Sequence, residues 1–329
     1  MSTTPAPLDA RAGGLMTLLC LTWALQQVSL KAVADDASPM LMVALRSLIA
    51  LALLALLMCR RGERPQRRRW PAGALAGMLF GLEYLLVAEA LRLTHASHVV
   101  IFLYTSPLFA ALGLHLRLPQ ERLNPWQWTG IALAFGGIAV AFFDGAGSAS
   151  PQALLGDLLA LAAGLAWGAT TITIRGSRLA DAPATETLLY QLFGAFLLLT
   201  PAAALTGQWH FTPTPAAWAH LGFQALIVSF ASFLAWCWLL RGYLASQLGA
   251  FAFLTPLFGV LLGVVLLGEQ PTPAFIAGSV LVLAGIALVS GAVRRPDGAG
   301  GSRRPPHPAP RAAAASPAPR RSTPPTACG

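Results

Sequence analysis

Charged residues are scarce in this sequence. Asp, Glu, Lys and Arg make up only 11% of its 329 residues, whereas an ordinary soluble domain carries about 25%. A soluble globule of this length needs a charged shell, so the scarcity excludes a soluble enzyme and a nucleic-acid-binding domain. A disordered chain is excluded as well, because 56% of the residues are hydrophobic. The composition predicts an integral membrane protein that crosses the bilayer many times.

Cysteines and catalytic motifs are also lacking. The four cysteines, Cys20, Cys59, Cys237 and Cys328, are far apart in the sequence, so they predict neither a disulfide framework nor a metal site. The chain contains no phosphate-binding loop, nucleophile elbow or HExxH motif. We therefore expect no enzyme activity, no cofactor and no ATP hydrolysis.

The sequence does contain a series of long apolar runs. A bilayer core of about 30 Å needs roughly 20 apolar residues in a helix, and lipid cannot satisfy exposed backbone groups, so each run is expected to be helical. The ten runs cover residues 12–32, 39–58, 71–92, 97–117, 126–143, 154–175, 185–206, 217–239, 247–267 and 273–293. The runs predict an all-α integral membrane fold with ten transmembrane helices.

The basic residues are unevenly divided between the two sides of the membrane. Of the 22 Lys and Arg residues, 19 fall in segments on the same side as the N-terminus, and only Lys31 and Arg92 fall on the other side. Lys and Arg collect on the cytoplasmic side of membrane proteins. We therefore expect a multi-pass protein of the bacterial inner membrane with both termini in the cytoplasm.

The two halves of the chain resemble each other. Trp23 in the first run matches Trp167 in the sixth at an offset of 144 residues, and Pro107 in the fourth run matches Pro256 in the ninth at a similar offset. Because five is an odd number, a second copy of five helices enters the membrane from the opposite face. The two repeats are therefore expected to be inverted, an arrangement that recurs in secondary transporters.

The repeat predicts how the chain is divided. Residues 1–11 form a cytoplasmic N-terminus, residues 12–143 the first repeat, residues 144–153 an outer linker and residues 154–293 the second repeat. Residues 294–329 are basic and rich in proline. They hold too few apolar residues to form a core, so we expect a disordered cytoplasmic tail.

Several short motifs carry a resemblance to a known family. They are Phe102–Phe109 (FLYTSPLF), Leu118–Leu123 (LPQERL), the stretch from Gly156 to Trp167, and Leu254–Phe258 (LTPLF) followed by Leu267-Gly268-Glu269. With these motifs the chain resembles the EamA-type proteins of the drug/metabolite transporter superfamily. The resemblance implies ten helices in two inverted repeats around a central cavity, and mostly export of amino acids or other metabolites. It does not define the solute.

Charged residues inside the runs are the first functional candidates, because burying them in lipid is costly. Arg46 lies near the middle of the second run and Glu83 near the middle of the third. Arg46 either binds an anionic group of the solute or pairs with Glu83 to hold the two helices together, and the sequence leaves both interpretations open. Glu89 lies nearer the surface, beside Arg92. Glu83 and Glu89 are the candidates for proton coupling.

Amide, hydroxyl and aromatic residues form a second group of candidates. Trp23, Gln26 and Gln27 share one helix face in the first run, and Trp167 and Thr170 repeat the pattern in the sixth. Duplicated polar residues at mid-depth favour the lining of a cavity over simple packing. Weaker candidates in the seventh and eighth runs are Tyr190, Gln191, Ser229, Ser232 and Trp236.

Prolines near the centres of two corresponding runs predict paired helix breaks. Tyr104 and Thr105 precede Pro107, and Thr255 precedes Pro256. A proline inside a helix frees backbone carbonyl groups and permits a kink. Paired interruptions of this kind point to a transport site, so Tyr104, Thr105 and Thr255 are added to the candidate substrate-binding residues.

The main hypothesis is a secondary transporter that exports amino acids or related amphiphilic solutes by alternating access through a midplane cavity. One alternative is uptake or exchange of a sugar or nucleotide-linked solute on the same fold. Two others are a membrane-embedded enzyme, which would need a catalytic cluster, and a structural or regulatory membrane protein without transport. The expected partners are a small-molecule solute and the lipid bilayer, with no nucleic acid, and a homodimer is a further alternative.

Overall fold

The computed structural model of the protein describes residues 10–117, 123, 125–145, 150–242 and 254–289. These residues all fall in the unit formed by residues 1–293. Regular structure in the described ranges is helical, apart from an isolated β-bridge between Ala37 and Phe211. The all-α part of the predicted fold class is therefore confirmed. Most of the predicted N-terminal segment, part of the linker and the whole tail lie outside the described residues.

The helices follow the predicted apolar runs closely. Their bounds are α1 Ala10–Ala32, α2 Pro39–Arg61, η1 Arg67–Arg69, α3 Trp70–Leu93, α4 Ala96–Leu103, α5 Ser106–Arg117, α6 Pro125–Gly145, α7 Pro151–Arg175, α8 Ala184–Leu205, α9 Pro215–Gly222, η3 Phe223–Ser232, α10 Phe233–Gly242, α12 Leu254–Leu267 and α13 Pro273–Val289. The fourth run forms α4 and α5, and the eighth forms three successive helical segments.

The length and hydropathy of these helices suit a membrane. Among the described residues, seven helical stretches are long and apolar enough to cross a bilayer, and α12 and α13 are shorter apolar helices. Many large apolar side chains on these helices are exposed in the protein alone, as expected for a surface that contacts lipid. A count of ten crossings stays a prediction.

Local sequence signals set several helix ends. Ser38 accepts a hydrogen bond from the backbone N–H of Leu41, and Ser150 accepts one from Ala153. Each serine is followed by a proline at the first helical position, where the fixed φ of proline suits the start of a helix. Gly62 ends α2 at a φ of 67°, a left-handed conformation that glycine adopts without strain.

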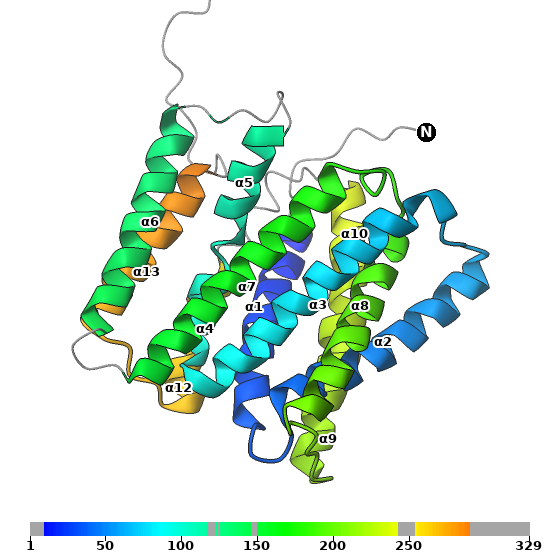
Figure 1. The fold of residues 1–329 in the computed structure, drawn as a ribbon, viewed down its shortest axis with the longest axis horizontal. Helices are drawn as coiled ribbons and strands as arrows, with labels where there is room; N and C mark the ends of the chain where they lie inside the picture. Colours follow the sequence, from blue (N-terminus) through cyan, green and yellow to red (C-terminus); the bar gives the residue numbers. More distant parts are fainter. Residues whose placement is uncertain (1–9, 118–122, 124, 146–149, 243–253, 290–329) are drawn as a thin grey trace, which may run out of the picture. The chain divides into compact units, whose positions relative to one another are not determined.

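Glycines allow two pairs of helices from different halves of the chain to pack closely. α3 packs along α8, where a Cβ atom on Gly77 would overlap the backbone carbonyl group of Tyr190. α6 packs along α13 (Figure 1), where a Cβ atom on Gly137 would lie 2.6 Å from the carbonyl oxygen of Gly278. Small residues of this kind let helix backbones approach and gain van der Waals contact in a membrane.

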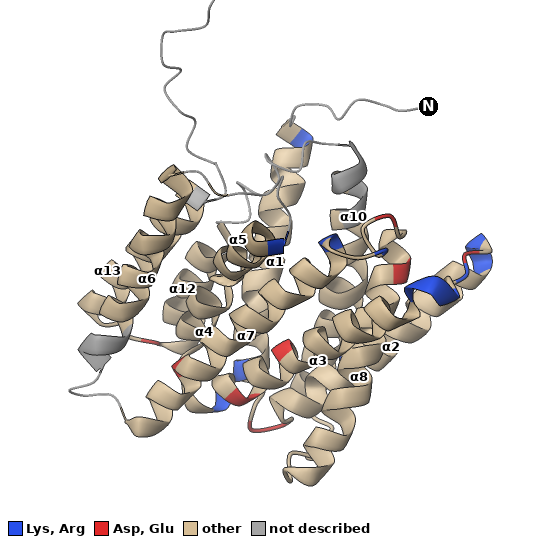
Figure 2. Ribbon diagram, turned by 45° about the horizontal axis from the view of Figure 1, so that its top comes forward, with Lys and Arg blue, Asp and Glu red and all other residues tan. Residues whose placement is uncertain are grey.

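Polar side chains join the helices at both ends of the bundle, where most of the charged residues lie (Figure 2). At one end, which we call the Lys31 end, Nζ of Lys31 in α1 donates to the carbonyl oxygen of Leu91 in α3 at 2.8 Å. At the opposite end, which we call the Arg69 end, Arg69 forms an ion pair of 2.8 Å with Glu186 in α8. The candidate site lies between these two ends.

Candidate functional site

Arg46 lies in α2, and only 2% of its surface is exposed. Its Nη1 atom donates a hydrogen bond of 2.5 Å to Oε1 of Gln224 in η3. Its guanidinium group lies 4.4 Å from the centre of the Tyr84 ring in α3. The Nε atom is buried without a hydrogen-bond partner. A buried donor without a partner is costly, so this guanidinium group is a candidate for binding an anionic group.

The direct ion pair between Arg46 and Glu83, one of the two predicted alternatives, is not formed. Arg46 donates to the neutral amide of Gln224 instead, because η3 brings that amide within reach of Nη1. Glu83 in α3 is 4% exposed, and its Oε2 atom has no hydrogen-bond partner among the described residues. The two charged groups interact electrostatically. They do not form an ion pair with each other.

Gln224 connects helices from both halves of the chain. Its side chain is fully buried, and its Nε2 atom donates to the backbone carbonyl oxygen of Gln26 in α1 at 2.8 Å. The side chain of Gln26 donates in turn to the hydroxyl of Tyr84 at 3.3 Å. Gln224 lies in a π-helical stretch, Phe223–Ser232, and π-helical turns occur frequently at functional sites.

Trp23 lies one turn before Gln26 on α1 and also contacts the second half of the chain. Its Nε1 atom donates to the hydroxyl of Ser232 at 2.9 Å. Its ring meets the ring of Trp236 edge-on, with centroids 5.7 Å apart. The structure therefore brings Trp23 together with two residues that the sequence offered only as weaker candidates.

The helix is interrupted before Pro107. α4 and α5 are separated by a turn at Tyr104 and Thr105. The hydroxyl of Thr105 donates at 2.6 Å to the backbone carbonyl oxygen of Phe102. The backbone N–H of Thr105 donates to the same carbonyl group at 3.2 Å, so Thr105 caps the end of α4, where carbonyls lack helical partners.

Other aromatic and hydroxyl candidates lie near this turn. The rings of Tyr104 and Trp167 meet edge-on, with centroids 5.3 Å apart. Thr255 in α12 is fully buried, and its hydroxyl has no hydrogen bond of good geometry. Pro256 lies in the first turn of α12. The residues just before Leu254 lie outside the described ranges, so the second predicted break is not tested.

Three sequence candidates make contacts away from Arg46, and a fourth, Gln27, forms no hydrogen bond with Arg46 among the described residues. Thr170 donates to a carbonyl group within its own helix, and Gln27 is buried with its Oε1 atom unpartnered. The hydroxyl of Tyr190 donates to Oε1 of Glu186 at the Arg69 end at 3.2 Å. Glu89 pairs with Arg92 at 2.8 Å near the Lys31 end. These contacts do not join the four residues to the group around Arg46.

A second polar cluster joins the two halves of the chain at the Lys31 end. Asp157 in α7 accepts a hydrogen bond of 2.6 Å from the hydroxyl of Thr94 and lies 3.0 Å from Nδ1 of His98. The ring of His98 stacks on Phe275 of α13, with centroids 3.8 Å apart. These contacts hold the connection between α3 and α4 against α7 and α13. We interpret the cluster as a structural junction.

Glu269, between α12 and α13, fixes the start of α4. It accepts hydrogen bonds from the backbone N–H groups of Ala96 at 2.6 Å and Ser97 at 3.0 Å, and it lies 3.7 Å from Nδ1 of His95. Burial raises the pKa of this carboxyl, but the hydrogen bonds from His95, Ser97 and Ala96 outweigh burial and lower the pKa to about 2. Glu269 is therefore a charged anchor near neutral pH.

Sequence reasoning missed Gln224. It named charged residues and the amides Gln26, Gln27 and Gln191, but not Gln224, a neutral amide in the eighth run. An amide in lipid is costly without a partner, so this cost, applied to every glutamine inside a run, is the signal that would have found it. Within the part of the chain that the structure describes, no group of three or more His, Cys, Asp or Glu side chains could hold a metal ion.

Comparison with known proteins defines the family. Residues 11–143 and 154–291 match the EamA-like transporter family. The chain belongs to this family. It is therefore a member of a family of membrane transporters and not an enzyme, and the two matching stretches correspond to the two halves that meet at Arg46 and Gln224.

Several curated proteins are similar to this EamA-like transporter. The uncharacterized transporter YoaV of Bacillus subtilis is 24% identical over 81% of this chain and 92% of the relative. A probable amino-acid metabolite efflux pump of Salmonella typhimurium is 25% identical over 85% of this chain and 94% of the relative. The uncharacterized inner membrane transporter YedA of Escherichia coli K12 is 26% identical over 78% of this chain and 83% of the relative.

A solved crystal structure shares the fold. It superposes with a TM-score of 0.60 over 86% of this chain and 97% of that chain, at 24% sequence identity. At this level of identity the likeness shows the fold alone. The role of the site has to be argued from its own geometry.

Proposed function

We propose that this EamA-like transporter is a secondary transporter of the bacterial inner membrane that exports amino acids or related amphiphilic solutes by alternating access. The chain crosses the membrane ten times in two inverted five-helix repeats, with both termini in the cytoplasm. The Lys31 end then faces outward and the Arg69 end faces the cytoplasm. The distribution of Lys and Arg supports this orientation. The names of two relatives support the location and the class of solute.

The buried guanidinium group of Arg46 is the observation that carries the proposal. Its Nη1 atom is held by a neutral amide from the other half of the chain, and its Nε atom has no partner. A carboxylate matches the fork of donors on a guanidinium group and forms short, charge-assisted hydrogen bonds with it. The rings of Tyr84, Trp23 and Tyr104 supply apolar surface at this depth. Together these groups suit a solute with a carboxylate and an apolar part.

A phosphate-bearing or nucleotide-linked solute fits the site less well. Several basic side chains would be needed to offset its charge. Among the residues that the structure describes, Arg46 is the only Lys or Arg placed well inside a long helix, because the others lie at helix ends or in connections. The site therefore favours a solute with a single carboxylate.

Counterflow measures this function directly. Full-length protein in vesicles should exchange labelled L-leucine, L-phenylalanine or L-threonine for the unlabelled solute. Arg46→Met should abolish the exchange. Methionine has a side chain of similar length but no hydrogen-bond donor for the carboxylate of the solute. Arg92→Met is the matched control, since Arg92 is half exposed in an ion pair at the Lys31 end, and its exchange should persist. Normal exchange by a well-folded Arg46→Met protein, or no saturable exchange by the wild type, would contradict the proposal.

Glu83 is the better of the two candidates for proton coupling. Its Oε2 atom is unpartnered and buried, whereas Glu89 is engaged with Arg92 and Gln208. Glu83→Gln should abolish accumulation driven by a pH gradient while preserving counterflow, which needs no net proton movement. Glu89→Gln should preserve both. If vesicles with Glu83→Gln accumulate the solute at the wild-type rate under a pH gradient, Glu83 is not the proton-coupling residue.

A further inference from the structure

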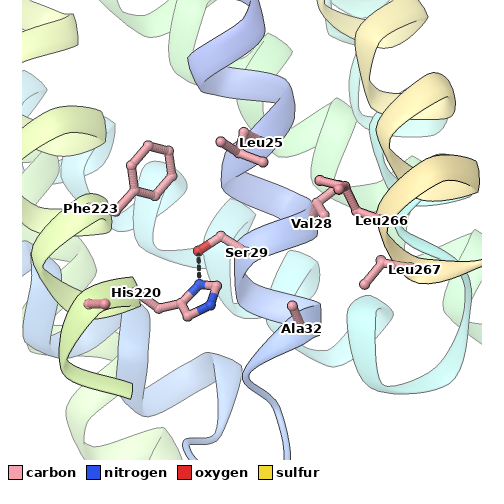
Figure 3. A pocket seen from close by; sticks show the side chains of 9 residues that line it. Leu25, Val28, Ser29, Ala32, His220, Phe223, Leu266 and Leu267 are labelled. Carbon is pink, nitrogen blue, oxygen red and sulfur yellow. Dashed lines mark hydrogen bonds between the residues drawn. The ribbon is translucent and has the colours of Figure 1, made fainter. Parts of the chain in front are cut away.

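A cavity of about 260 Å³ lies between α1, α9, η3 and the end of α12, towards the Lys31 end (Figure 3). Its wall is mostly apolar and includes Leu25 and Val28 of α1, Phe223 of η3, and Leu266 and Leu267 of α12. The polar side chains around Arg46 do not line it. The cavity is therefore a feature separate from the Arg46 site.

One polar pair lies in the wall of the cavity. Oγ of Ser29 in α1 and Nδ1 of His220 in α9 are joined by a hydrogen bond of 2.8 Å (Figure 3). Among the described residues that line the cavity, these two carry the only polar side chains. α1 belongs to the first stretch of the family match and α9 to the second. The bond therefore joins the two halves of the chain.

The cavity adjoins the Arg46 site. Leu25 and Phe223 in its wall directly precede Gln26 and Gln224 in the sequence. Gln224 donates to the backbone of Gln26 at 2.8 Å and holds Arg46 at 2.5 Å. Gln26 and Gln224 therefore connect the wall of the cavity to the Arg46 site through neighbouring residues of α1 and η3.

The related helices in the other half pack differently. We call the contact of α1 with α9, η3 and α12 the α1 seam, and the contact of α7 with α3, α4 and α5 the α7 seam. At the offset of 144 residues, Val28 corresponds to Ile172. Val28 lines the cavity, whereas Ile172 lies so close to α5 that a Cβ atom on Gly113 would overlap its Cδ1 atom. The α1 seam is loose where the α7 seam is filled.

We propose that this cavity is the passage to the Lys31 end and binds the apolar part of an amphiphilic solute, and that the Ser29–His220 bond closes it. The inference rests on the proposed function, because it takes Arg46 as the site for the carboxylate. Apolar walls favour an aliphatic or aromatic side chain. A volume of about 260 Å³ is smaller than the roughly 300–1,000 Å³ of sites for drug-sized ligands, which suits an amino acid.

A reversible bridge across the cavity tests the passage. Ser29→His places a second imidazole opposite His220, and facing imidazoles bind Zn²⁺. In vesicles that contain the full-length protein, Zn²⁺ should lower the counterflow of labelled L-phenylalanine by Ser29→His about tenfold, and a chelator should restore it. Ser29→His combined with His220→Ala is the matched control, and its exchange should be insensitive to Zn²⁺.

Filling the cavity tests the apolar selectivity. Ala32→Phe adds a ring at the rim of the cavity. Counterflow of L-phenylalanine should fall about tenfold more than counterflow of glycine, because only the larger solute needs the filled volume. Leu21→Phe, on an exposed face of the same helix, is the matched control and should leave the ratio of the two solutes unchanged.

The outcomes separate the inference from the proposed function. Binding of Zn²⁺ to Ser29→His can be detected as a shift of the melting temperature. If Zn²⁺ binds but does not slow exchange, the cavity is not the passage. Equal loss of glycine and L-phenylalanine exchange in Ala32→Phe would overturn the selectivity. An effect of Ala32→Phe that follows the acyl-chain length of the vesicle lipid would assign the cavity to a lipid tail instead. If the wild-type protein exchanges none of these amino acids, the proposed function itself is wrong.

Discussion

The α1 seam and the α7 seam occupy corresponding places in the two halves of the chain, yet they are packed differently. In the α7 seam, a Cβ atom on Gly164 would lie 2.8 Å from the carbonyl oxygen of Phe102, and one on Gly168 would lie 2.8 Å from Cβ of Phe109. In the α1 seam lies a cavity of about 260 Å³, with Ser29 and His220 hydrogen-bonded to each other in its wall. Equivalent helices therefore adopt a filled and a loose arrangement within one structure.

This difference is what a two-state transporter built from inverted repeats requires. If the second repeat is inverted, the α1 seam leads to the outer face and the α7 seam to the cytoplasmic face. A loose outer seam and a filled inner seam then describe one state, and exchange of the two packings describes the other. Neither Asp157 nor Glu269 lines the cavity. The contacts of Glu269 with the start of α4 belong to neither seam, so we expect these contacts to persist in both states.

The largest expected effect concerns the close packing of the α7 seam. Gly168→Leu should lower the free energy of unfolding by about 3 kcal/mol, because the added side chain overlaps α5 and forces the helices apart. Ala32→Leu, at the rim of the loose seam, should change it by less than about 0.5 kcal/mol. Thermal unfolding of the two purified variants measures the difference. Equal stabilities of the two variants would show that both seams accept a larger side chain equally well. This result would contradict the difference in packing.

The junction at Glu269 should be the next most sensitive feature. Glu269→Ala removes two hydrogen bonds to backbone N–H groups at the start of α4 and should cost about 2 kcal/mol. Loss of stability without a change in the preference for L-phenylalanine over glycine would place Glu269 outside the moving seams. A changed preference would contradict that placement.

The stability supplied by Glu269 should also depend on pH in a defined direction. Its pKa is lowered from 4.5 to about 2 in the folded protein, so the carboxylate stabilises the fold above its ordinary pKa. The contribution is lost as the pH falls below 4.5 towards about 2. Thermal unfolding across this range should show the wild type and Glu269→Gln converging at the acid end. A constant gap between their melting temperatures would contradict the assignment.

A smaller effect is expected for the two corresponding tryptophans. Trp23 donates to Ser232 across the α1 seam, whereas Trp167 meets Tyr104 through its ring. Trp23→Phe should therefore cost about 1 kcal/mol more than Trp167→Phe, the typical contribution of one hydrogen bond. Thermal unfolding again gives the comparison. The difference should vanish in a Ser232→Ala background, and its survival there would point to packing instead.

The smallest effect is expected outside the seams. Deletion of residues 298–329 should leave counterflow and its solute preference unchanged, because the family match ends at residue 291. Equal protein in the vesicles is the control. Reduced exchange by the shortened chain would show that transport depends on more than the two seams.

The sequence predicts the helices well and the contacts between them poorly. Apolar runs and serine-proline starts define α2 and α7 locally, so their positions follow from composition and capping. The interruption before Pro107 is likewise a local effect. The sequence could single out Arg46 because a buried charge is costly wherever it lies. Its partner could not, because Gln224 is 178 residues away in the sequence and depends on how η3 packs against α2.

The difference between the seams is only partly visible in the sequence. Val28 and Ile172 are both β-branched apolar residues at corresponding positions. One borders a cavity and the other fills the space beside Gly113. The residues of the two helices differ as well, because Gly164 and Gly168 of α7 correspond to Cys20 and Ala24 of α1 at the offset of 144 residues. The sequence defines the duplicated framework and these glycines, but not how closely the helices pack in each seam.

Paired distances between spin labels test the central claim most directly. One pair, at Ala32 and Ala219, spans the α1 seam at the Lys31 end, and a second pair, at Leu116 and Arg178, reports on α5 and α7 at the Arg69 end. In bilayers with L-phenylalanine, we predict two populations for each pair, with the first distance shortening as the second lengthens. A single unchanging distance in both pairs, or movement of one seam without the other, would contradict exchange between a filled and a loose seam.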